Sequence, residues 1–254
     1  LHSFPTRRSS DLSNMKKVGL ECGGKSPFIV SEKCNELEKA SKVLAKNIFY
    51  NQGQICSASS RLIIHKNIKD KFLSLLVEES RKYIPKNPLS LESEVGAVIS
   101  QKQKKKIEEY ISLGVESGAR ITTIESDTLP FEDGSYINPV IFDDVDLDSK
   151  IAQDEIFGPV LIVLTVSNIK EAIEIANSSR YGLASSIWTS DYDEAYQVSR
   201  LLESGIVHVN SYGDDDNTVP FGGVKESGLG TDKSIHAFNE YSNVKTTWMS
   251  FNSL

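Results

Sequence analysis

The sequence has few cysteines and no cluster of metal-binding side chains. Its 254 residues contain only 3 cysteines, Cys22, Cys34 and Cys56, and 4 histidines, all widely spaced. No CxxC motif or Cys/His spacing typical of zinc occurs, so we expect no metal site. No apolar run reaches the about 20 residues that a membrane helix needs. An odd number of separated cysteines indicates free thiols, so we expect a reducing, cytoplasmic location.

The chain also lacks an excess of positive charge. It has 28 Lys and Arg against 35 Asp and Glu, a net charge of −7. This balance argues against nucleic acid or an anionic membrane as the main partner. Apolar residues make up 39% and charged residues 25%, which is ordinary for a globular protein. The length permits one large or two modest domains.

The first residues do not resemble a folded segment. Residues 1–12, LHSFPTRRSSDL, resemble an in-frame translation of a short-read sequencing adapter. They are basic but precede no apolar stretch, so they do not resemble a secretory signal. We therefore expect an artefact over 1–12, a native sequence that starts near Ser13, and an incomplete chain.

Short β-rich runs alternate with amphipathic helices along the rest of the chain. We predict strands over residues 26–31, 61–65, 119–124, 136–142, 159–166, 183–188, 205–210 and 244–251. We predict helices after a capping box of Asn35 and Glu38, after Asn67, after Ser100, over 167–178 with Ser167 as its cap, and over 191–204. This alternation predicts an α/β fold with a largely parallel sheet. We interpret the lysine run that follows Ser100 as a solvated helix face.

Cys56 occupies a position that could suit a reactive thiol. It follows the polar loop NQGQ (51–54) and precedes the small residues SASS. Unpaired backbone N–H groups there would lower the pKa of the thiol and favour the thiolate. A buried cysteine acting as a small apolar residue is the alternative. The local sequence leaves both open.

Six segments resemble, in order, the motifs of the aldehyde dehydrogenase superfamily. They are LECGGKSP (20–27), NQGQICSASSR (51–61), DEIFGPV (154–160), YGLASSIWTSD (181–191), GIVHVN (205–210) and PFGGVKESGLG (220–230). The match runs from about Val18 to the C-terminus. It implies an aldehyde dehydrogenase-like catalytic domain with a mostly parallel sheet. Most of the Rossmann-type cofactor-binding domain would lie upstream of Ser13.

The resemblance assigns roles to particular residues. Cys56 matches the nucleophile and Glu21 the general base. Glu155 and Phe157 match residues that hold the nicotinamide ribose and pack beside the nicotinamide, so NAD or NADP is the expected cofactor. Phe221 matches an aromatic residue that lines the substrate tunnel.

The resemblance also implies a mechanism. The Cys56 thiolate attacks the aldehyde, and the backbone N–H of Cys56 and an asparagine side chain, expected upstream of Ser13, stabilise the oxyanion. Glu21 then activates water to hydrolyse the thioester that forms after oxidation. Because the rest of the cofactor-binding domain is expected upstream, we predict that this chain alone does not oxidise aldehydes.

The substrate is expected to be a small aldehyde. Residues 212–223 and 232–238 resemble the branch that acts on γ-glutamyl-γ-aminobutyraldehyde and other aminoaldehydes. Three adjacent carboxylates, Asp214, Asp215 and Asp216, would suit a cationic tail at the tunnel mouth. A solvated acidic loop is the alternative interpretation. Betaine aldehyde and simple aliphatic aldehydes are the alternative substrates.

The resemblance also sets expected domain boundaries and partners. Residues 13–22 would end the cofactor-binding domain, 23–238 would form the catalytic domain with its active-site loops, and 239–254 would form an oligomerisation strand and tail. A homodimer or homotetramer is expected for the full-length protein.

Three further alternatives stay open. A non-catalytic protein with the same fold would need neither Cys56 nor Glu21. A cysteine-dependent ester or thioester hydrolase would need a histidine base near the thiol, and His65 is expected in a strand. Cys22 replaces the usual apolar residue beside the base, either as a small apolar substitute or as a thiol that can pair with Cys56.

Overall fold

The protein is built around one seven-stranded sheet. A computed structural model describes residues 16–124, 130–131, 133–213 and 216–251. The sheet order is β4-β5-β6-β3-β2-β8-β9, with every neighbouring pair parallel except β4 and β5. The strands are β2 (Pro27–Val30), β3 (Arg61–His65), β4 (Arg120–Thr123), β5 (Val140–Asp143), β6 (Val160–Val166), β8 (Ala184–Trp188) and β9 (Ile206–Val209). The predicted α/β fold with a largely parallel sheet is confirmed.

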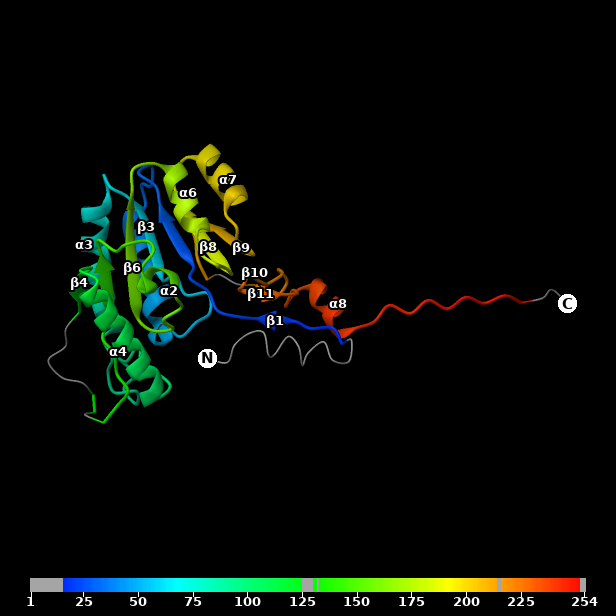
Figure 1. The fold of residues 1–254 in the computed structure, drawn as a ribbon, viewed down its shortest axis with the longest axis horizontal. Helices are drawn as coiled ribbons and strands as arrows, with labels where there is room; N and C mark the ends of the chain where they lie inside the picture. Colours follow the sequence, from blue (N-terminus) through cyan, green and yellow to red (C-terminus); the bar gives the residue numbers. More distant parts are fainter. Residues whose placement is uncertain (1–15, 125–129, 132, 214–215, 252–254) are drawn as a thin grey trace.

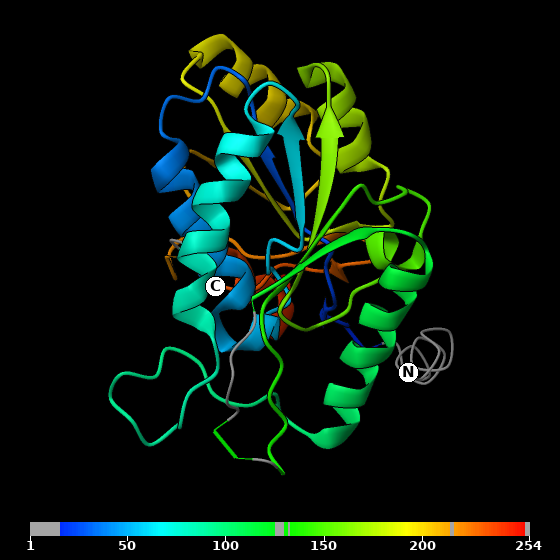
Figure 2. The ribbon, with the colours of Figure 1, turned by 90° about the vertical axis from the view of Figure 1, so that its left-hand side faces the viewer.

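Helices cover both faces of this sheet (Figure 2). The helices α2 (Leu37–Phe49) and α3 (Lys69–Ser80) pack on one face through a core that includes Phe28, Leu44 and Phe72. The other face carries α4 (Gln101–Glu116), α5 (Lys150–Gln153), α6 (Ile169–Asn177) and α7 (Tyr192–Leu201), with a second core. Because both faces are covered, β2, β3 and β8 are buried along their whole length. This burial is the reason that the strands are apolar or small-residue runs with little alternation.

Two small antiparallel sheets bring the ends of the chain together beside this body. The strand β1 (Leu20–Glu21) pairs with β11 (Gly228–Leu229), and β10 (Val224–Lys225) pairs with β7 (Tyr181–Gly182). Figure 1 shows β1, β10 and β11 lying together next to the short helix α8 (Phe238–Tyr241). The pairing places Glu21 opposite Gly228, more than two hundred residues later in the chain.

Helix caps were predicted correctly only in part. Ser100 caps α4 by accepting a hydrogen bond from the backbone N–H of Gln103. The predicted capping box at Asn35 is wrong, because Glu36 precedes α2 and makes no side-chain cap. The predicted cap at Asn67 is also wrong, since its side chain donates to Glu32 and Ile68 precedes α3.

The start of α6 differs from the prediction by one residue. Asn168, not Ser167, is the cap, and its side chain accepts from the backbone N–H of Glu171. The Glu171 carboxylate in turn accepts from the backbone N–H of Ser167. This reciprocal arrangement satisfies two backbone donors at the start of the helix.

Two strand predictions differ from the structure. The predicted strand 136–142 begins only at Val140, because Pro139 has no N–H group to give to a ladder. The predicted strand 244–251 is not a strand within this chain; Figure 1 shows it leading away from the body. Its pairing with a neighbouring subunit stays a prediction. Over the described residues, no helix combines the length and apolarity needed to cross a membrane.

Candidate active site at the amino ends of the strands

The loops that precede β2, β3 and β6 meet at one edge of the sheet. Parallel strands begin at the same edge, so residues shortly before each strand are brought together. A Cβ atom added to Gly24 would lie 2.5 Å from the carbonyl oxygen of Cys56, and one added to Gly23 would lie 2.3 Å from Oε2 of Glu155. The Gly23–Gly24 segment therefore passes between Cys56 and Glu155, at a separation that only glycine permits.

A tight turn presents Cys56. Asn51, Gln52 and Gly53 all have left-handed backbone angles, with φ of 52°, 58° and 67°. The side chains of Asn51 and Gln54 each donate to the other residue's backbone oxygen, both at 3.1 Å. A Cβ on Gly53 would lie 2.2 Å from the backbone oxygen of Gly158. The turn thus packs directly against the loop that contains Glu155 and Phe157.

Two distant side chains hold the segment that follows Cys56. Oδ1 of Asn47, in α2, accepts a hydrogen bond of 2.6 Å from the backbone N–H of Ser59. The hydroxyl of Tyr212 donates to the backbone oxygen of Ser57 at 2.6 Å. Segments before and after the thiol are therefore both anchored, which limits the movement of Cys56.

The helix α4 holds the backbone of residues 155–157. Nζ of Lys106 donates to the backbone oxygen of Glu155 at 3.2 Å. Nε2 of Gln103 donates to the backbone oxygens of Ile156 and Phe157 at 3.2 and 2.8 Å. Phe157 has a left-handed φ of 58°, a conformation that surrounding contacts must maintain in a bulky residue.

This arrangement corrects the interpretation of the lysine run. Lys102 and Lys105 are exposed as predicted, but Lys104 and Lys106 are partly buried and donate to backbone oxygens. Gln103 and Lys106 lie one helical turn apart, and this spacing could have predicted that both side chains contact the same segment. The predicted solvated face did not include this contact.

Glu21 lies near a carboxylate that the sequence did not single out. Burial raises the pKa of Glu21, and the negative charge of Asp232 raises it further. Asp232 is placed by an antiparallel bridge to Phe221, with backbone hydrogen bonds of 2.8 and 2.7 Å. A cavity of about 190 Å³ is lined by Glu21, Asp232, Glu240 and Tyr241, among others. Asp232 therefore pairs with Phe221 through its backbone and lines the same cavity as Glu21.

The electrostatic environment of Cys56 differs from the expectation. Burial raises the pKa of the thiol, and the negative charges of Glu21 and Glu155 raise it further. Backbone hydrogen bonding at Ser57 and Cys56 lowers the pKa, as predicted, but does not outweigh these effects. The close packing of Gly23 and Gly24, which follow Glu21, against Glu155 and Cys56 agrees with this charge coupling.

Glu155 is buried but linked to several donors. Burial raises the pKa of its carboxyl group, while the Gly24 N–H, at 3.0 Å from Oε1, lowers it. The positive charges of Lys106 and Lys25 also lower this pKa. These contacts place Glu155 against the segment that carries Glu21.

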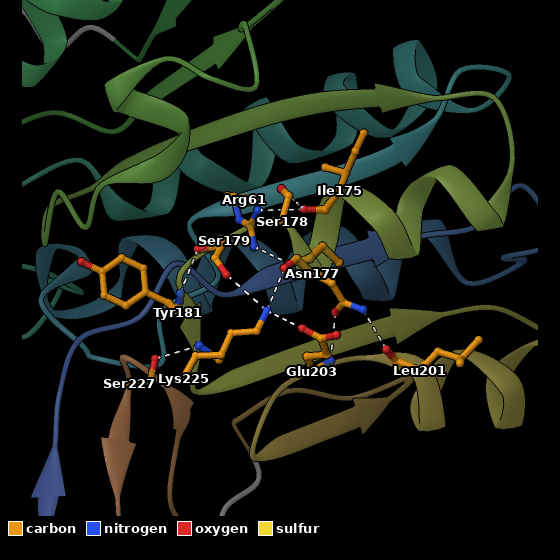
Figure 3. Close-up of polar contacts among 12 residues, drawn as sticks. Arg61, Ile175, Asn177, Ser178, Ser179, Tyr181, Leu201, Glu203, Lys225 and Ser227 are labelled. Carbon is orange, nitrogen blue, oxygen red and sulfur yellow. Dashed lines mark hydrogen bonds and ion pairs between the residues drawn. The ribbon is translucent and has the colours of Figure 1, made fainter.

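A buried arginine, Arg61, contacts the same segment and also the end of α6, where Figure 3 shows its hydrogen bonds. Nε of Arg61 donates to the backbone oxygen of Lys25 at 2.8 Å, and its NH1 and NH2 groups donate to Ile175 and Ala176 at the end of α6. Burial lowers the pKa of Arg61 to about 10 and that of Lys25 to about 7. Arg61 therefore links the end of α6 to the strand that follows Gly24.

Lys225, in β10, connects this strand to the end of α6 and to the loop after α7. Figure 3 shows Nζ of Lys225 directed at the backbone oxygens of Asn177 and Ser179, at 2.7 and 3.2 Å, and at the carboxylate of Glu203, at 2.6 Å. Ser227 also accepts from the backbone N–H of Gly182 at 2.9 Å. Residues 224–227, which lead into β11 opposite Glu21, are thus held to the body of the protein.

The remaining predicted site residues are only partly placed. Phe221 is half-buried, with Nζ of Lys233 5.0 Å from its ring centroid. Asp216 is exposed, and its carboxylate accepts from the Thr218 N–H at 2.7 Å, a contact that lowers its pKa. Asp214 and Asp215, like residues 1–12, lie outside the described residues. The cationic-tail prediction is therefore not tested.

The structure can be compared with the predictions on the cysteines and on a metal site over the described residues. Cys22, Cys34 and Cys56 all lie in the described ranges and form no disulfide, and Cys22 donates its backbone N–H to the backbone oxygen of Ser227 at 2.9 Å. Within the described ranges, no group of three or more His, Cys, Asp or Glu side chains is arranged to hold a metal ion.

Comparison with known proteins identifies the family. Residues 7–247 match the model of the aldehyde dehydrogenase family. The chain belongs to this family. The resemblance of the six motifs is thereby confirmed, together with the fold that it implied.

Individual members of the aldehyde dehydrogenase family cover the chain almost completely. NADP/NAD-dependent aldehyde dehydrogenase PuuC of Escherichia coli (strain K12) is 41% identical over 238 residues, which are 94% of this chain and 47% of that protein. A structure of P. syringae indole-3-acetaldehyde dehydrogenase AldA, in complex with NAD+, matches with a TM-score of 0.92 and 43% identity over 97% of this chain and 50% of that one.

A third match is another solved structure. The structure of gamma-glutamyl-gamma-aminobutyraldehyde dehydrogenase from Burkholderia cenocepacia J2315 has a TM-score of 0.90 and 43% identity, over 94% of this chain and 48% of that chain. The chain spans about half the length of the curated relatives it matches.

Proposed function

We propose that this chain supplies the catalytic part of an NAD(P)-dependent aldehyde dehydrogenase that oxidises an aldehyde to a carboxylic acid. The observation that supports this most directly is that the Gly23–Gly24 segment, which follows Glu21 closely, packs against both Cys56 and Glu155 at one edge of the sheet. A thiol, a base and a carboxylate acceptor are the groups that this reaction needs in one place.

Cys56 is the proposed nucleophile and Glu21 the proposed base. The Cys56 thiolate would add to the aldehyde carbonyl, and its own backbone N–H would donate to the oxyanion that forms. After oxidation, Glu21 would take a proton from water as that water attacks the thioester. A raised pKa suits this role, because a carboxylate with a higher pKa is a stronger base near neutral pH.

The residues present fit a nicotinamide cofactor. Oε1 of Glu155 accepts from Gly24, and its carboxylate packs against Gly23 at a separation that leaves no room for a Cβ. Glu155 would thus accept hydrogen bonds from the ribose hydroxyls, and Phe157 would pack beside the ring. When bound, NAD or NADP supplies the acceptor for the hydride that leaves the substrate.

The substrate proposed is an aminoaldehyde. The likeness to a gamma-glutamyl-gamma-aminobutyraldehyde dehydrogenase supports this choice, as does the acidic run Asp214, Asp215 and Asp216. A cationic tail would be attracted by such charges. Betaine aldehyde and simple aliphatic aldehydes are the competing substrates, and relative kcat/KM values would separate them.

The cellular setting and assembly are also proposals. Three free thiols fit a reducing, cytoplasmic compartment. The tail after α8 carries exposed apolar side chains, Val244, Trp248 and Phe251 among them, which fits a strand that pairs with another subunit in a homodimer or homotetramer. Residues 13–22 would then end the cofactor-binding domain, 23–238 form the catalytic domain, and 239–254 form the oligomerisation segment.

Replacing Cys56 tests the proposal. In the protein extended to the length of its relatives, Cys56→Ser should abolish NADH formation from aldehydes, because a hydroxyl is a far weaker nucleophile at neutral pH. Cys34→Ser is the matched control, since Cys34 is a buried thiol in the core, and should retain activity. Chain 1–254 alone should form no NADH.

The variant Glu21→Gln distinguishes an aldehyde dehydrogenase from a hydrolase and from a non-catalytic protein. The variant should form one equivalent of NADH and a stable acyl–Cys56 thioester, seen by mass spectrometry, because deacylation lacks its base. Full turnover by Cys56→Ser would refute the assignment of the nucleophile. Ester hydrolysis by Cys56 without nucleotide and without aldehyde oxidation would indicate a hydrolase. Inactivity in both assays would indicate a non-catalytic role.

A further inference from the structure

The chain that follows β9 contacts the segment that carries Cys56. The hydroxyl of Tyr212 donates a hydrogen bond of 2.6 Å to the backbone oxygen of Ser57, the residue after Cys56 and 155 positions away from Tyr212. Tyr212 is also the first residue of the segment 212–223, which is expected to contact the substrate. One side chain therefore joins this segment to the residue beside the thiol.

A reversal of the chain after β9 brings Tyr212 to this place. Asn210 has a left-handed φ of 52°, and its side-chain amide binds the backbone N–H and the backbone oxygen of Thr189, both at 2.9 Å. The backbone oxygen of the next residue, Ser211, accepts from the hydroxyl of Ser186, which lies earlier along β8. The chain thus turns back along the sheet at Asn210. These contacts fix the backbone immediately before Tyr212.

The side chain of Tyr212 is buried among other rings. Tyr212 is only 7% exposed and belongs to the core on the α2 face of the sheet. Its ring centroid lies 6.2 Å from that of Phe28 in β2 and 4.8 Å from that of His208 in β9. A buried hydroxyl is costly without a partner, and the Ser57 oxygen is that partner. The packing of the ring therefore keeps the hydroxyl on Ser57.

The residue after Tyr212 approaches a second support of the same segment. Oδ1 of Asn47 accepts a hydrogen bond of 2.6 Å from the backbone N–H of Ser59. A Cβ added to Gly213, whose φ is 76°, would lie 3.5 Å from Nδ2 of this asparagine. The start of segment 212–223 thus lies against both groups that hold residues 57–59, the Tyr212 hydroxyl and the Asn47 amide.

The backbone N–H of Ser57 is one of the groups that stabilise the thiolate of Cys56. Burial raises the pKa of the thiol, and hydrogen bonding by this N–H lowers it. Only two soft dihedral angles, φ and ψ, separate the N–H of Ser57 from its backbone oxygen. A fixed oxygen therefore restricts the direction in which the N–H points. Holding the oxygen of Ser57 favours a constant hydrogen bond to the sulfur.

We propose that Tyr212 is a positioning residue for Cys56: its hydroxyl holds Ser57 so that the Ser57 N–H stays directed at the sulfur. This proposal rests on the proposed role of Cys56 as the nucleophile. It makes the reactivity of the thiol depend on the first residues of the segment that is expected to contact the substrate.

Alkylation of Cys56 by iodoacetamide in Tyr212→Phe tests the proposal, because this variant keeps the ring and removes only the hydroxyl. Site-resolved mass spectrometry of chain 1–254 over a range of pH gives the pKa of the thiol. We expect this pKa to rise by about half a unit, because the thiolate loses a directed donor. Alkylation near neutral pH should become about threefold slower. The rate for the buried Cys34 in the same sample should not change.

A purely structural role for Tyr212 would give a different result. Loosening of the fold would expose both thiols and speed the alkylation of Cys34 and of Cys56. Tyr83→Phe is the matched control, since Tyr83 is a buried tyrosine of the same core, and it should leave the pH profile of Cys56 unchanged. An unchanged profile in a folded Tyr212→Phe, faster alkylation of Cys56, or an equal shift in Tyr83→Phe would each overturn the proposal.

If Tyr212→Phe does not fold, Gly213→Ala decides. A Cβ at its left-handed φ strains the backbone beside the Tyr212 hydroxyl, so alkylation of Cys56 should slow about twofold. Gly118→Ala carries a similar backbone cost with nothing within 4 Å of its Cβ and should not change the rate. Equal rates in the two variants would overturn the proposal. None of these measurements needs turnover, so they can fail while loss of activity in Cys56→Ser still supports the nucleophile.

Discussion

Gly53 should be among the least replaceable glycines in the chain. Its φ of 67° lies in the left-handed region, where a residue with a Cβ costs about 1–2 kcal/mol. In addition, the new Cβ would lie 2.2 Å from the backbone oxygen of Gly158 and 2.9 Å from that of Ile48. Both obstacles are backbone atoms, which cannot rotate away. We expect Gly53→Ala to lower the free energy of unfolding by roughly 3 kcal/mol.

Gly118→Ala separates the two contributions. Gly118 has a φ of 82°, but a Cβ there would meet nothing within 4 Å. This variant therefore carries only the cost of the left-handed backbone, partly offset by the reduced entropy of the unfolded chain, and should lose about 1 kcal/mol or less. Gly19→Ala, with no positive φ and open space around its Cβ, should be nearly neutral.

Thermal unfolding followed by circular dichroism measures the difference. For a chain of this size, 1 kcal/mol shifts Tm by about 2–4 °C. Gly53→Ala should thus lower Tm by roughly 6–12 °C, and Gly118→Ala by about 4 °C or less. Gly53→Ala should also change the rate at which iodoacetamide alkylates Cys56, because the turn that presents the thiol must move. Equal losses of stability in the two variants would refute the close packing of Gly53 on Gly158.

Three further predictions concern the electrostatics and the support of the site. Glu155→Gln should lower the pKa of Cys56 by removing a negative charge, and so speed its alkylation by iodoacetamide at fixed pH by a factor of roughly two to five. Asp232→Asn should lower the pKa of Glu21, so the acid limb of the kcat profile of the whole enzyme should move to lower pH. Arg61→Leu would leave three backbone oxygens without their donor and should destabilise the chain by about 3–5 kcal/mol in urea unfolding.

Each of these three predictions has a control variant or an outcome that would contradict it. Glu174→Gln removes an exposed carboxylate in α6 and should leave the alkylation rate of Cys56 unchanged. An acid limb that stays in place in Asp232→Asn would show that Asp232 does not act on Glu21. Full retention of stability in Arg61→Leu would mean that the three oxygens find other donors.

The strands of the main sheet could be predicted because their environment makes them distinctive. A strand buried on both faces needs an apolar or small-residue run, and β2, β3, β6 and β8 all lie where such runs were found. Helix caps were harder, because only at α6 do two residues of similar propensity, Ser167 and Asn168, compete, whereas α2 and α3 follow Glu36 and Ile68, which make no side-chain cap. The fold decides between them through packing that extends beyond the local sequence.

By itself, the sequence determined the alternation of strands and helices, the family motifs and the candidates Cys56 and Glu21, because these depend on residue type and local order. Only the tertiary structure decided what surrounds this site: Gln103 donates to the backbone oxygen of Phe157, and Asp232 lies beside Glu21. These contacts join residues more than fifty positions apart, and no local pattern encodes them. The pKa of Cys56 illustrates the difference, since its nearby N–H groups lower it while burial and distant carboxylates raise it above its ordinary value.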